Sequence, residues 1–145
     1  MSAKRGVDFL KAIADNMVKT NSFDSVTRNV KITGGGDGRC VAELTVSKEH
    51  LNMNGALHVG FTTTIVDLMT TYALMSYPSQ PGVSVDLHVC SLKEAKEGEE
   101  LVIEANTIKA GENLAYIECE LRRKNDDAVV SRGGHTKYVY TKAKI

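Results

Sequence analysis

The segment from His50 to Tyr77 constrains the fold more than any other part of this sequence of 145 residues. It begins as a polar loop that contains Asn52 and Asn54, and it continues as a long apolar stretch that contains a single carboxylate, Asp67. A carboxylate is rarely buried without a partner, because removing it from water costs more free energy than apolar packing returns. The sequence therefore predicts a buried helix in which Asp67 has a specific role.

Length and charge narrow the class of protein. A chain of 145 residues predicts a single domain spanning residues 1–145, large enough to bury roughly 70% of the surface of its unfolded chain. Lys plus Arg and Asp plus Glu both number 18, and this zero net charge argues against nucleic-acid binding. No segment reaches the roughly 20 apolar residues that a membrane span needs.

The cysteines and the first residues bear on the compartment. Cys40, Cys90 and Cys119 are far apart and form no CxxC pair, so we expect reduced thiols in a cytosol-like compartment. The first 20 residues lack the continuous apolar core of a secretory signal but are amphipathic. The prediction is a cytoplasmic protein, with a mitochondrial location left open.

Periodicity and turn residues divide the chain into helices and strands. Apolar residues recur at three- and four-residue spacing near the beginning, which predicts an amphipathic helix over residues 5 to 19. The glycine-rich segment 34–38 lies between two alternating segments and precedes no helix or Gly-Lys-Ser/Thr sequence, so it predicts a hairpin turn rather than a phosphate-binding loop. The predicted strands cover residues 26–33, 40–46, 83–92, 101–110, 114–123 and 128–140.

The central helix is predicted over residues 58 to 76. Its apolar residues cover most of its circumference, so we expect other elements to surround it, and Pro78 ends it. Short turns join the four strands that follow, which predicts an antiparallel meander. A curved antiparallel sheet wrapped around one long central helix, with a second helix at the N-terminal end, satisfies this order. The fold class is α+β, and the architecture is the hotdog fold.

Asp67 and His58 are the first candidates for catalysis. The pKa of a desolvated Asp67 would rise toward the working pH of a general base, although a neighbouring hydroxyl or a subunit edge would also explain a structural Asp. His58 lies where unpaired N–H groups at a helix start suit an oxyanion, or it simply caps the helix. The two residues are nine positions apart, which on a helix means about 180° of rotation and roughly 13 Å of rise. If both are catalytic, the site needs two chains.

The strand over residues 83–92 offers a second constellation. Alternation predicts that Ser84, Asp86 and His88 share one face. Ser84 and His88 would then stand about 13 Å apart at 3.3 Å per residue, which excludes a hydrogen-bonded Ser–His pair. Ser84 remains a candidate for positioning a water molecule, whereas Asp86 and His88 are expected to be solvated or at an interface.

Basic residues near the end of the chain are candidates for phosphate binding. Arg132, His135 and Lys137 lie close together in the sequence, although dispersed surface charges explain them equally well. The four histidines have no metal-ligand spacing and no accompanying cysteine cluster. The sequence therefore predicts no metal site.

Four segments taken in order resemble a known family. They are HLNMNGALHVG at residues 50–60, the threonine-rich helix with Asp67, PGVSVD at residues 81–86 and GGHTK at residues 133–137. This set, within a similarity that covers about residues 5 to 140, resembles the hotdog acyl-CoA thioesterases of the phenylacetate-pathway type. The resemblance implies hydrolysis of an acyl-CoA thioester, with a medium- to long-chain fatty acyl group, to the free acid and CoA. It implies no metal or redox cofactor.

The resemblance also implies a role for each site residue. Asn52 and the N–H of Val59 would polarise the thioester carbonyl, and His58 would structure the helix start. Asp67 and Ser84 from the second subunit would activate and hold the attacking water. A homodimer is thus required, and the family implies a homotetramer of two such dimers. The predicted substrate-binding residues are Gly60, Arg132, His135 and Lys137.

Two positions depart from the family pattern. The family motif is His-Gly-Gly, and Val59 stands in place of its first Gly. Val59 keeps its N–H, but its β-branched side chain reduces the room for a thioester. Lower activity, an altered substrate preference and a non-catalytic acyl-CoA- or lipid-binding protein remain alternatives. Gly134 replaces an arginine of related sequences, so either Arg132 supplies that charge or CoA phosphate binding is weaker.

Overall fold

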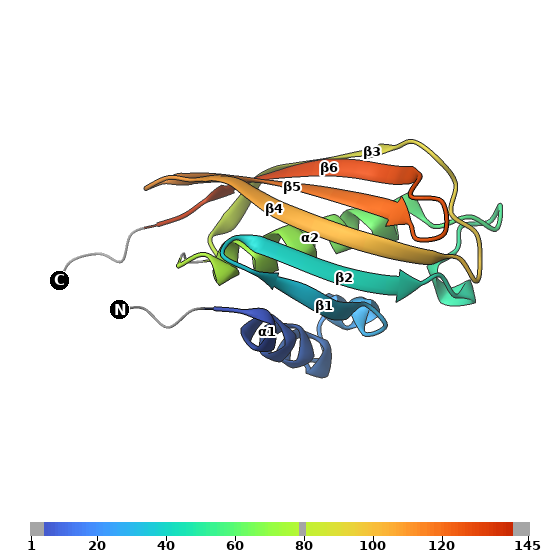
Figure 1. Cartoon of the computed structure of the whole chain (residues 1–145), viewed down its shortest axis with the longest axis horizontal. Helices are drawn as coiled ribbons and strands as arrows, with labels where there is room; N and C mark the ends of the chain where they lie inside the picture. The colour runs from blue at the N-terminus through green and yellow to red at the C-terminus, as the bar shows by residue number, and fades with distance from the viewer. Residues whose placement is uncertain (1–4, 79–80, 141–145) are drawn as a thin grey trace.

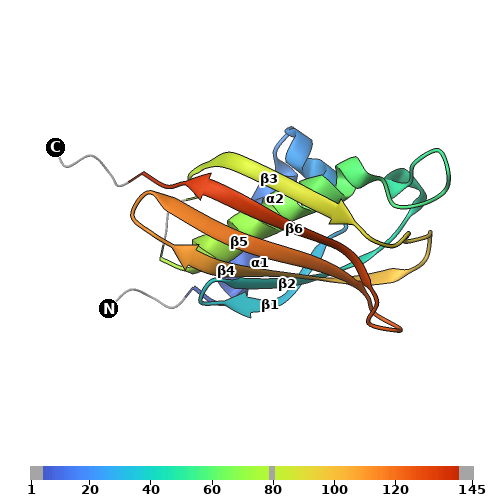
Figure 2. The same cartoon turned by 90° about the horizontal axis from the view of Figure 1, so that it is seen from above.

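The structure, a computed structural model, describes residues 5–78 and 81–140. Six strands form one antiparallel sheet in the order β1-β2-β4-β5-β6-β3, and α2 lies along one face of this sheet (Figures 1 and 2). In chain order the elements are α1 (Val7–Lys19), the 3-10 helix η1 (Phe23–Thr27), β1 (Lys31–Gly36), β2 (Arg39–Thr45), the 3-10 helix η2 (Lys48–His50), α2 (Val59–Ser76), β3 (Val83–Ser91), β4 (Glu100–Ala110), β5 (Leu114–Arg123) and β6 (Val129–Tyr138).

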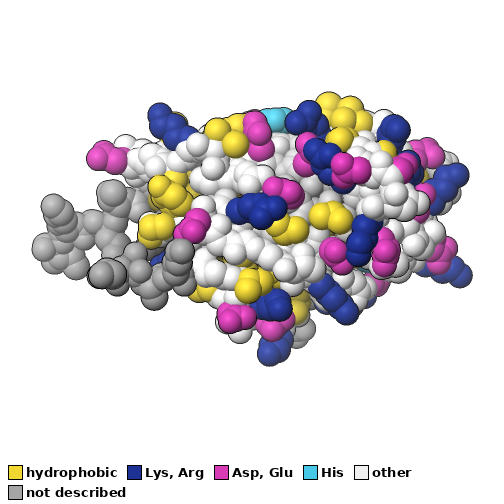
Figure 3. Space-filling model, viewed as in Figure 1, with side chains coloured by type: hydrophobic (Ala, Val, Ile, Leu, Met, Phe, Trp, Pro, Cys, Tyr) yellow, Lys and Arg dark blue, Asp and Glu magenta, His cyan; other side chains and the backbone are white. Residues whose placement is uncertain are grey.

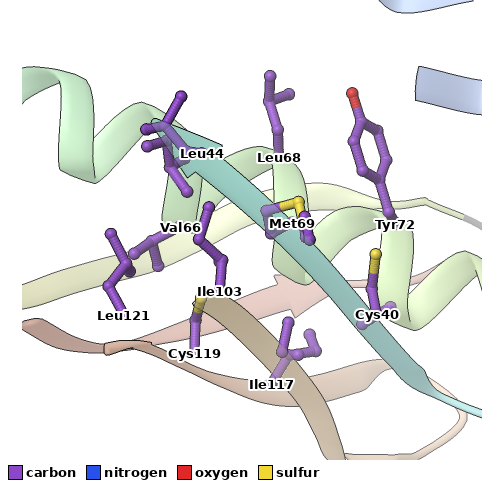
Figure 4. Packing of buried hydrophobic residues seen from close by; sticks show 14 of the residues in the cluster. Cys40, Leu44, Val66, Leu68, Met69, Tyr72, Ile103, Ile117, Cys119 and Leu121 are labelled. Carbon is purple, nitrogen blue, oxygen red and sulfur yellow. The ribbon is translucent and has the colours of Figure 1, made fainter. Parts of the chain in front are cut away.

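Helix α2 is surrounded on most sides, as its sequence predicts. Ten of its 18 residues are buried, and the apolar ones among them share one hydrophobic core with the inner faces of the strands and with α1 (Figure 4). Ile65 on α2, Ile103 on β4 and Leu121 on β5 are fully buried. Each such side chain contributes about 1.5–3 kcal/mol relative to full exposure. The helix ends at Ser76, two residues before Pro78.

The first hairpin is confirmed, but its turn is shorter than the glycine-rich segment. Strand β1 continues through Gly36, and the turn consists of Asp37 and Gly38, both with positive φ. Two central residues with positive φ make the type of two-residue turn that suits the twist of paired strands. Gly35 has a packing role, because a Cβ there would lie 2.6 Å from Cδ1 of Leu10. Helix α1 therefore docks closely on β1.

The strand predicted over residues 26–33 is wrong in its first part. Residues 23–27 form η1, and β1 begins only at Lys31. The hydroxyl of Thr27 donates to the carbonyl of Asp24 at 2.8 Å, and that of Ser25 donates to the carbonyl of Ser22 at 2.9 Å. Such local bonds offer the backbone an alternative to a sheet ladder. The apolar alternation at these positions reflects contacts with α1 and α2, which flank η1.

The four-stranded meander predicted after α2 is only partly right. Strands β4, β5 and β6 form a meander, whereas β3 pairs with β6 and lies at the edge of the sheet. The segment between β3 and β4 crosses the end of the sheet, where Leu92 and Lys93 donate to the carbonyl of Val130. In the described part of the chain, no helix is long and apolar enough to cross a membrane.

Candidate active site

Asp67 lies on α2 between the buried core and an open side of the helix. Its side chain is 43% exposed, and burial raises the pKa of this carboxyl above its usual range. The nearby ammonium of Lys137 opposes that rise in the pKa of Asp67. The arrangement suits a general base, because a carboxylate with a raised pKa accepts a proton more readily.

His135 on β6 connects Asp67 with Ser84. The His135 side chain is fully buried; Nε2 lies 2.8 Å from Oγ of Ser84, and Nδ1 lies 3.9 Å from Oδ1 of Asp67. Nδ1 is also 2.8 Å from the hydroxyl of Thr70. Burial lowers the pKa of His135 to about 4, so the imidazole is neutral near pH 7.

The hydrogen bonds fix the tautomer of this neutral imidazole. The Thr70 hydroxyl lies 2.6 Å from the Val66 carbonyl and 3.0 Å from that of Asp67, so its proton is committed to the helix backbone. Thr70 must then accept from Nδ1–H of His135, because a neutral imidazole has one donor and one acceptor nitrogen. Nε2 is therefore the acceptor, and the Ser84 hydroxyl donates to it.

Lys137 on β6 is also buried, and it is hydrogen-bonded to a threonine of α2. Its side chain is only 4% exposed, and Nζ donates to the hydroxyl of Thr71 at 2.9 Å. The Thr71 hydroxyl in turn donates to the carbonyl of Asp67 at 2.8 Å. Burial lowers the pKa of Lys137, and the charge of Asp67 opposes this change. His135 and Lys137, predicted as substrate-binding residues, thus lie inside the fold beside Asp67.

A β-bulge brings Ser84 to this cluster. Ser84 pairs with Lys137 and Asp86 with Thr136, so Val85 is the extra residue. Ser84 consequently faces the same side as His135, whereas Asp86 and His88 face the other side and are exposed. The predicted single face for Ser84, Asp86 and His88 is wrong for this reason. The sequence contains no turn residue that marks the bulge.

The start of α2 forms a second group of polar atoms. His58 caps the helix, and its Nδ1 accepts the N–H of Gly60 at 2.8 Å. A Cβ on Gly60 would lie 2.9 Å from that nitrogen, so glycine is required for this cap. No hydrogen bond between described residues uses the N–H of Val59. The Val59 N–H is therefore open to an incoming acceptor, although its side chain is half exposed beside it.

Asn52 organises the loop that precedes α2. Its Oδ1 accepts the backbone N–H groups of Asn54 at 2.9 Å and Ala56 at 3.1 Å, as an Asx turn does. Because the oxygen is used in this way, Nδ2 is the outward-facing donor of the amide, and it pairs with no acceptor in residues 5–78 or 81–140. Asn52 and Val59 thus offer two donors at one end of the helix.

The structure separates these donors from Asp67 along α2. Asp67 follows Val59 by eight positions, which corresponds to roughly 12 Å of helical rise. Both the donors at the start of α2 and the carboxylate of Asp67 lie on a side of the helix that is incompletely covered. This side carries Gly60, Thr63, Thr64, Asp67 and Thr71. Beside this side of α2, β3 forms an edge strand on which Val83 and Val85 are 48% and 61% exposed.

Arg132 lies apart from the Asp67 cluster. It alternates with His135 along β6 and points to the outer face of the sheet, where it pairs with Glu120 at 3.1 Å. That face carries interspersed cations and anions, which are visible in Figure 3. Among them, Arg39 pairs with Glu104 at 3.0 Å.

Comparisons with known proteins agree with this architecture. Residues 54–130 match the family model described as the thioesterase superfamily. Acyl-coenzyme A thioesterase 13 of Mus musculus is 36% identical over 131 residues, which cover 90% of this chain and 94% of that protein. The crystal structure of zebrafish thioesterase superfamily member 2 superposes with a TM-score of 0.90 at 34% identity, over 92% of this chain and 97% of that one.

A more distant structure shares the fold. The PaaI protein from the phenylacetic acid degradation operon of E. coli superposes with a TM-score of 0.77 over 93% of this chain and 96% of that one, at 16% identity. The curved sheet around α2 is therefore the hotdog arrangement that the sequence predicts. The chain belongs to the thioesterase superfamily.

Proposed function

We propose that this protein hydrolyses acyl-CoA thioesters, with medium- to long-chain fatty acyl groups, to the free acid and CoA. The observation that carries the proposal is the cluster around His135: its Nε2 orients the Ser84 hydroxyl, and its Nδ1 lies 3.9 Å from Asp67, a carboxylate of raised pKa. The likeness to proteins named acyl-coenzyme A thioesterase 13 supports the substrate class. The location proposed with it is cytoplasmic or mitochondrial.

In the proposed reaction, Asp67 and Ser84 act on the attacking water. The Ser84 proton is directed to His135, so the lone pairs of Oγ accept a hydrogen from that water. Asp67 then removes the other proton as the water attacks the carbonyl carbon. Proton return from Asp67 to the departing sulfur completes the release of CoA. No step is assigned to a metal or redox cofactor.

The donors at the helix start would stabilise the negative charge on the carbonyl oxygen. Nδ2 of Asn52 and the N–H of Val59 are available as donors in the described chain, and the partial positive charge of the start of α2 adds to them. Because Val59 and Asp67 lie roughly 12 Å apart along the helix, each site combines the donors of one subunit with Asp67 and Ser84 of the other. This proposal makes the homodimer the catalytic unit.

A direct attack by Ser84 is less well supported than an attack by water. Ser84 and His135 are at the distance of a nucleophile and its base, 2.8 Å. However, the pKa of His135 lies near 4, lowered by burial, and its Nδ1 donates to Thr70 rather than to a carboxylate. A weakly basic imidazole is a poor acceptor for a serine proton at neutral pH. We therefore assign the base to Asp67.

The open edge of β3 and the uncovered side of α2 support a symmetric dimer. An exposed, nine-residue edge strand presents unpaired N–H and C=O groups that favour pairing with a second strand. The small and polar residues on the open side of α2 allow a second chain to approach closely. A homotetramer of two such dimers is proposed from the family resemblance.

Mixing two inactive variants tests the shared site. The Asp67→Asn chain keeps the carbonyl donors and loses the general base. The Asn52→Ala chain keeps the general base and loses the donor of the Asn52 amide. If each site draws on two chains, unfolding and refolding the two variants together restores about one quarter of the wild-type activity, because half of the dimers carry one intact site of two. Each variant refolded alone is the control. A mixture that stays as inactive as the separate variants would rule out the two-chain site.

Val59 supports a second candidate function, the binding of acyl-CoA or lipid without turnover. Its β-branched side chain is half exposed beside the N–H that the carbonyl must approach. A wild-type protein that binds acyl-CoA by calorimetry but releases no CoA thiol would establish this alternative. Release of thiol at rates above background establishes the esterase instead.

A further inference from the structure

One side of α2 faces α1 and η1, at the β1 edge of the sheet. Phe61, Ile65, Leu68 and Tyr72 recur at three- and four-residue spacing along α2 and line two hollows beneath α1 and η1. Arg28, which directly follows η1, lines both hollows. The two hollows therefore adjoin along a single face of the helix.

The first hollow opens beside the donor end of α2. It has a volume of ≈ 370 Å³ and is lined by His58 and Gly60 at the helix start, together with Phe23, Val26 and Phe61. Its lining is mostly apolar. An acyl chain whose carbonyl binds at Val59 would reach this hollow directly.

The second hollow lies deeper and is smaller. Its volume is ≈ 40 Å³, and apolar side chains of α1, β1 and α2 surround it, among them Ala14, Ile32 and Leu68. One water needs roughly 10–15 Å³ by this measure, so there is room for the last one or two groups of a chain. Tyr72 lines this cavity as well.

Tyr72 places an unpaired polar atom in this apolar setting. The residue is 4% exposed, and its hydroxyl has no hydrogen-bond partner among the described residues. Figure 4 shows the ring with its oxygen directed to the same side as Leu68 and away from Cys40, Ile117 and Cys119. Burying a hydroxyl without a partner costs about 1–3 kcal/mol, and such groups in native proteins have an explanation.

The charges near Tyr72 restrict what its partner can be. Asp15 and Arg28 line the cavity, and Arg28 is paired with Glu49. Burial raises the pKa of Tyr72, and the carboxylate of Asp24 adds to this rise. Because the cation is already paired, the two acidic groups disfavour a carboxylate at this place. A neutral hydroxyl, which both donates and accepts, suits a phenol that stays protonated.

We propose that the acyl chain runs from the helix start into the cavity at Tyr72, and that the Tyr72 hydroxyl binds a hydroxyl group at the far end of the chain. The protein would then prefer ω-hydroxyacyl-CoA over the unsubstituted acyl-CoA of the same length. This inference rests on the proposed thioesterase function and adds the substrate class. Tyr72 acts here as a specificity-determining residue with no part in the chemical step.

The test compares matched pairs of acyl-CoA, with and without a terminal hydroxyl, over a series of medium to long chains. At the preferred length, kcat/KM for the hydroxylated substrate should exceed that for its partner by about tenfold, since one buried hydrogen bond changes affinity by this order. Tyr72→Phe should bring the ratio close to one. Tyr116→Phe, which removes a tyrosine hydroxyl on the outer face of the sheet, should leave the wild-type ratio unchanged.

A second variant tests the path of the chain. Ala14→Leu fills the cavity from α1 and should move the length preference toward shorter chains, whether or not they carry a hydroxyl. A ratio that is equal in the wild type and in Tyr72→Phe overturns the inference, and so does an unaltered length preference in Ala14→Leu.

Failure of the proposed function gives a different result. If no thioester of the series is hydrolysed, the esterase proposal is wrong, and the same pairs are then compared by calorimetric binding. A binding preference for the hydroxylated chain that Tyr72→Phe abolishes still supports the site. Equal binding of both chains by the wild type rejects it.

Discussion

The hydroxyl of Ser84 lies 2.8 Å from Nε2 of His135, although the two residues are 51 positions apart in the chain. This contact exists because β3 pairs with β6 and because the bulge at Val85 turns Ser84 toward the inner face. The imidazole reaches Thr70 on α2 through its other nitrogen. Thr70 on α2 thereby orients the hydroxyl of Ser84 on the edge strand β3 through the His135 ring.

Thr70→Val should lower kcat with little change in KM. Valine keeps the shape but removes the acceptor of His135 Nδ1–H, so the tautomer that orients the Ser84 proton loses its support. Misorientation of a positioned group costs on the order of tenfold to a hundredfold in rate. Steady-state kinetics measure the loss, and the ¹⁵N shifts of the His135 ring report the tautomer. Thr107→Val on β4 is the matched control, because its hydroxyl has no partner in the described chain. A tautomer unchanged by Thr70→Val would contradict the assignment.

Acid should destabilise the protein in part through His135. The folded state holds the pKa near 4, below the ordinary value of 6.5, because the ring is buried. Between these two values the unfolded chain binds a proton that the folded chain does not, so stability falls as pH drops from 6.5 toward 4. The loss should total about 3 kcal/mol. Urea unfolding of the wild type and of His135→Gln across this range measures it. Identical pH profiles for the two proteins would show that His135 does not contribute.

Asp67→Asn should lose hydrolysis and gain stability at neutral pH. Removal of a general base costs typically 10²–10⁴-fold in rate. The pKa of Asp67 is raised in the folded state, chiefly by burial, so ionisation at high pH favours the unfolded chain. The melting temperature of the variant should therefore exceed that of the wild type at pH 7, and the difference should shrink as pH falls below the raised pKa. Turnover at the wild-type rate would exclude Asp67 as the base.

Val59→Gly should raise kcat/KM for acyl-CoA. Glycine removes the β-branched side chain beside the N–H that would bind the carbonyl, and it leaves that N–H in place. The same change lowers helix stability by roughly a few tenths of a kcal/mol, because valine is already less favourable in a helix than alanine, and glycine is only somewhat less favourable than valine. Thermal melts therefore accompany the assay of thiol release. Val59→Ala separates the effect of side-chain size from that of backbone freedom. A rate that falls in both variants would show that the valine assists binding.

The central helix could be predicted because its signals are local. Apolar residues that cover most of its circumference indicate burial on most sides, and Pro78 sets its end. The edge position of β3 could not be predicted in this way. Short turns favour pairing of neighbours in sequence, but the choice between β4 and β6 as the partner of β3 depends on how the sheet closes around α2.

The candidate site, too, could be predicted only in part. The sequence named Asp67 and Ser84 as candidates, and the helical spacing of His58 and Asp67 led to the prediction of two chains. It did not predict that His135 would join Asp67 and Ser84, because an alternating strand shows which residues share a face and not which strand lies opposite. The GGHTK segment gave one usable signal: Gly133 admits no Cβ, which would lie 2.7 Å from the carbonyl oxygen of His88 and 3.0 Å from Cγ1 of Val66 on α2. This close packing brings β6 against α2 next to His135, the following inward-facing residue of the strand.

By itself the sequence determined the two α-helices and the six strands apart from the start of β1, the buried helix with its one carboxylate, and the polar loop that opens it. These features follow from periodicity and from backbone rules that act over a few residues. Only the tertiary structure decided that Ser84 faces inward, that His135 is neutral and buried, and that Lys137 lies beside Asp67. Those outcomes depend on a bulge, a strand partner and the solvent excluded by α2, which are properties of contacts between segments distant in the chain.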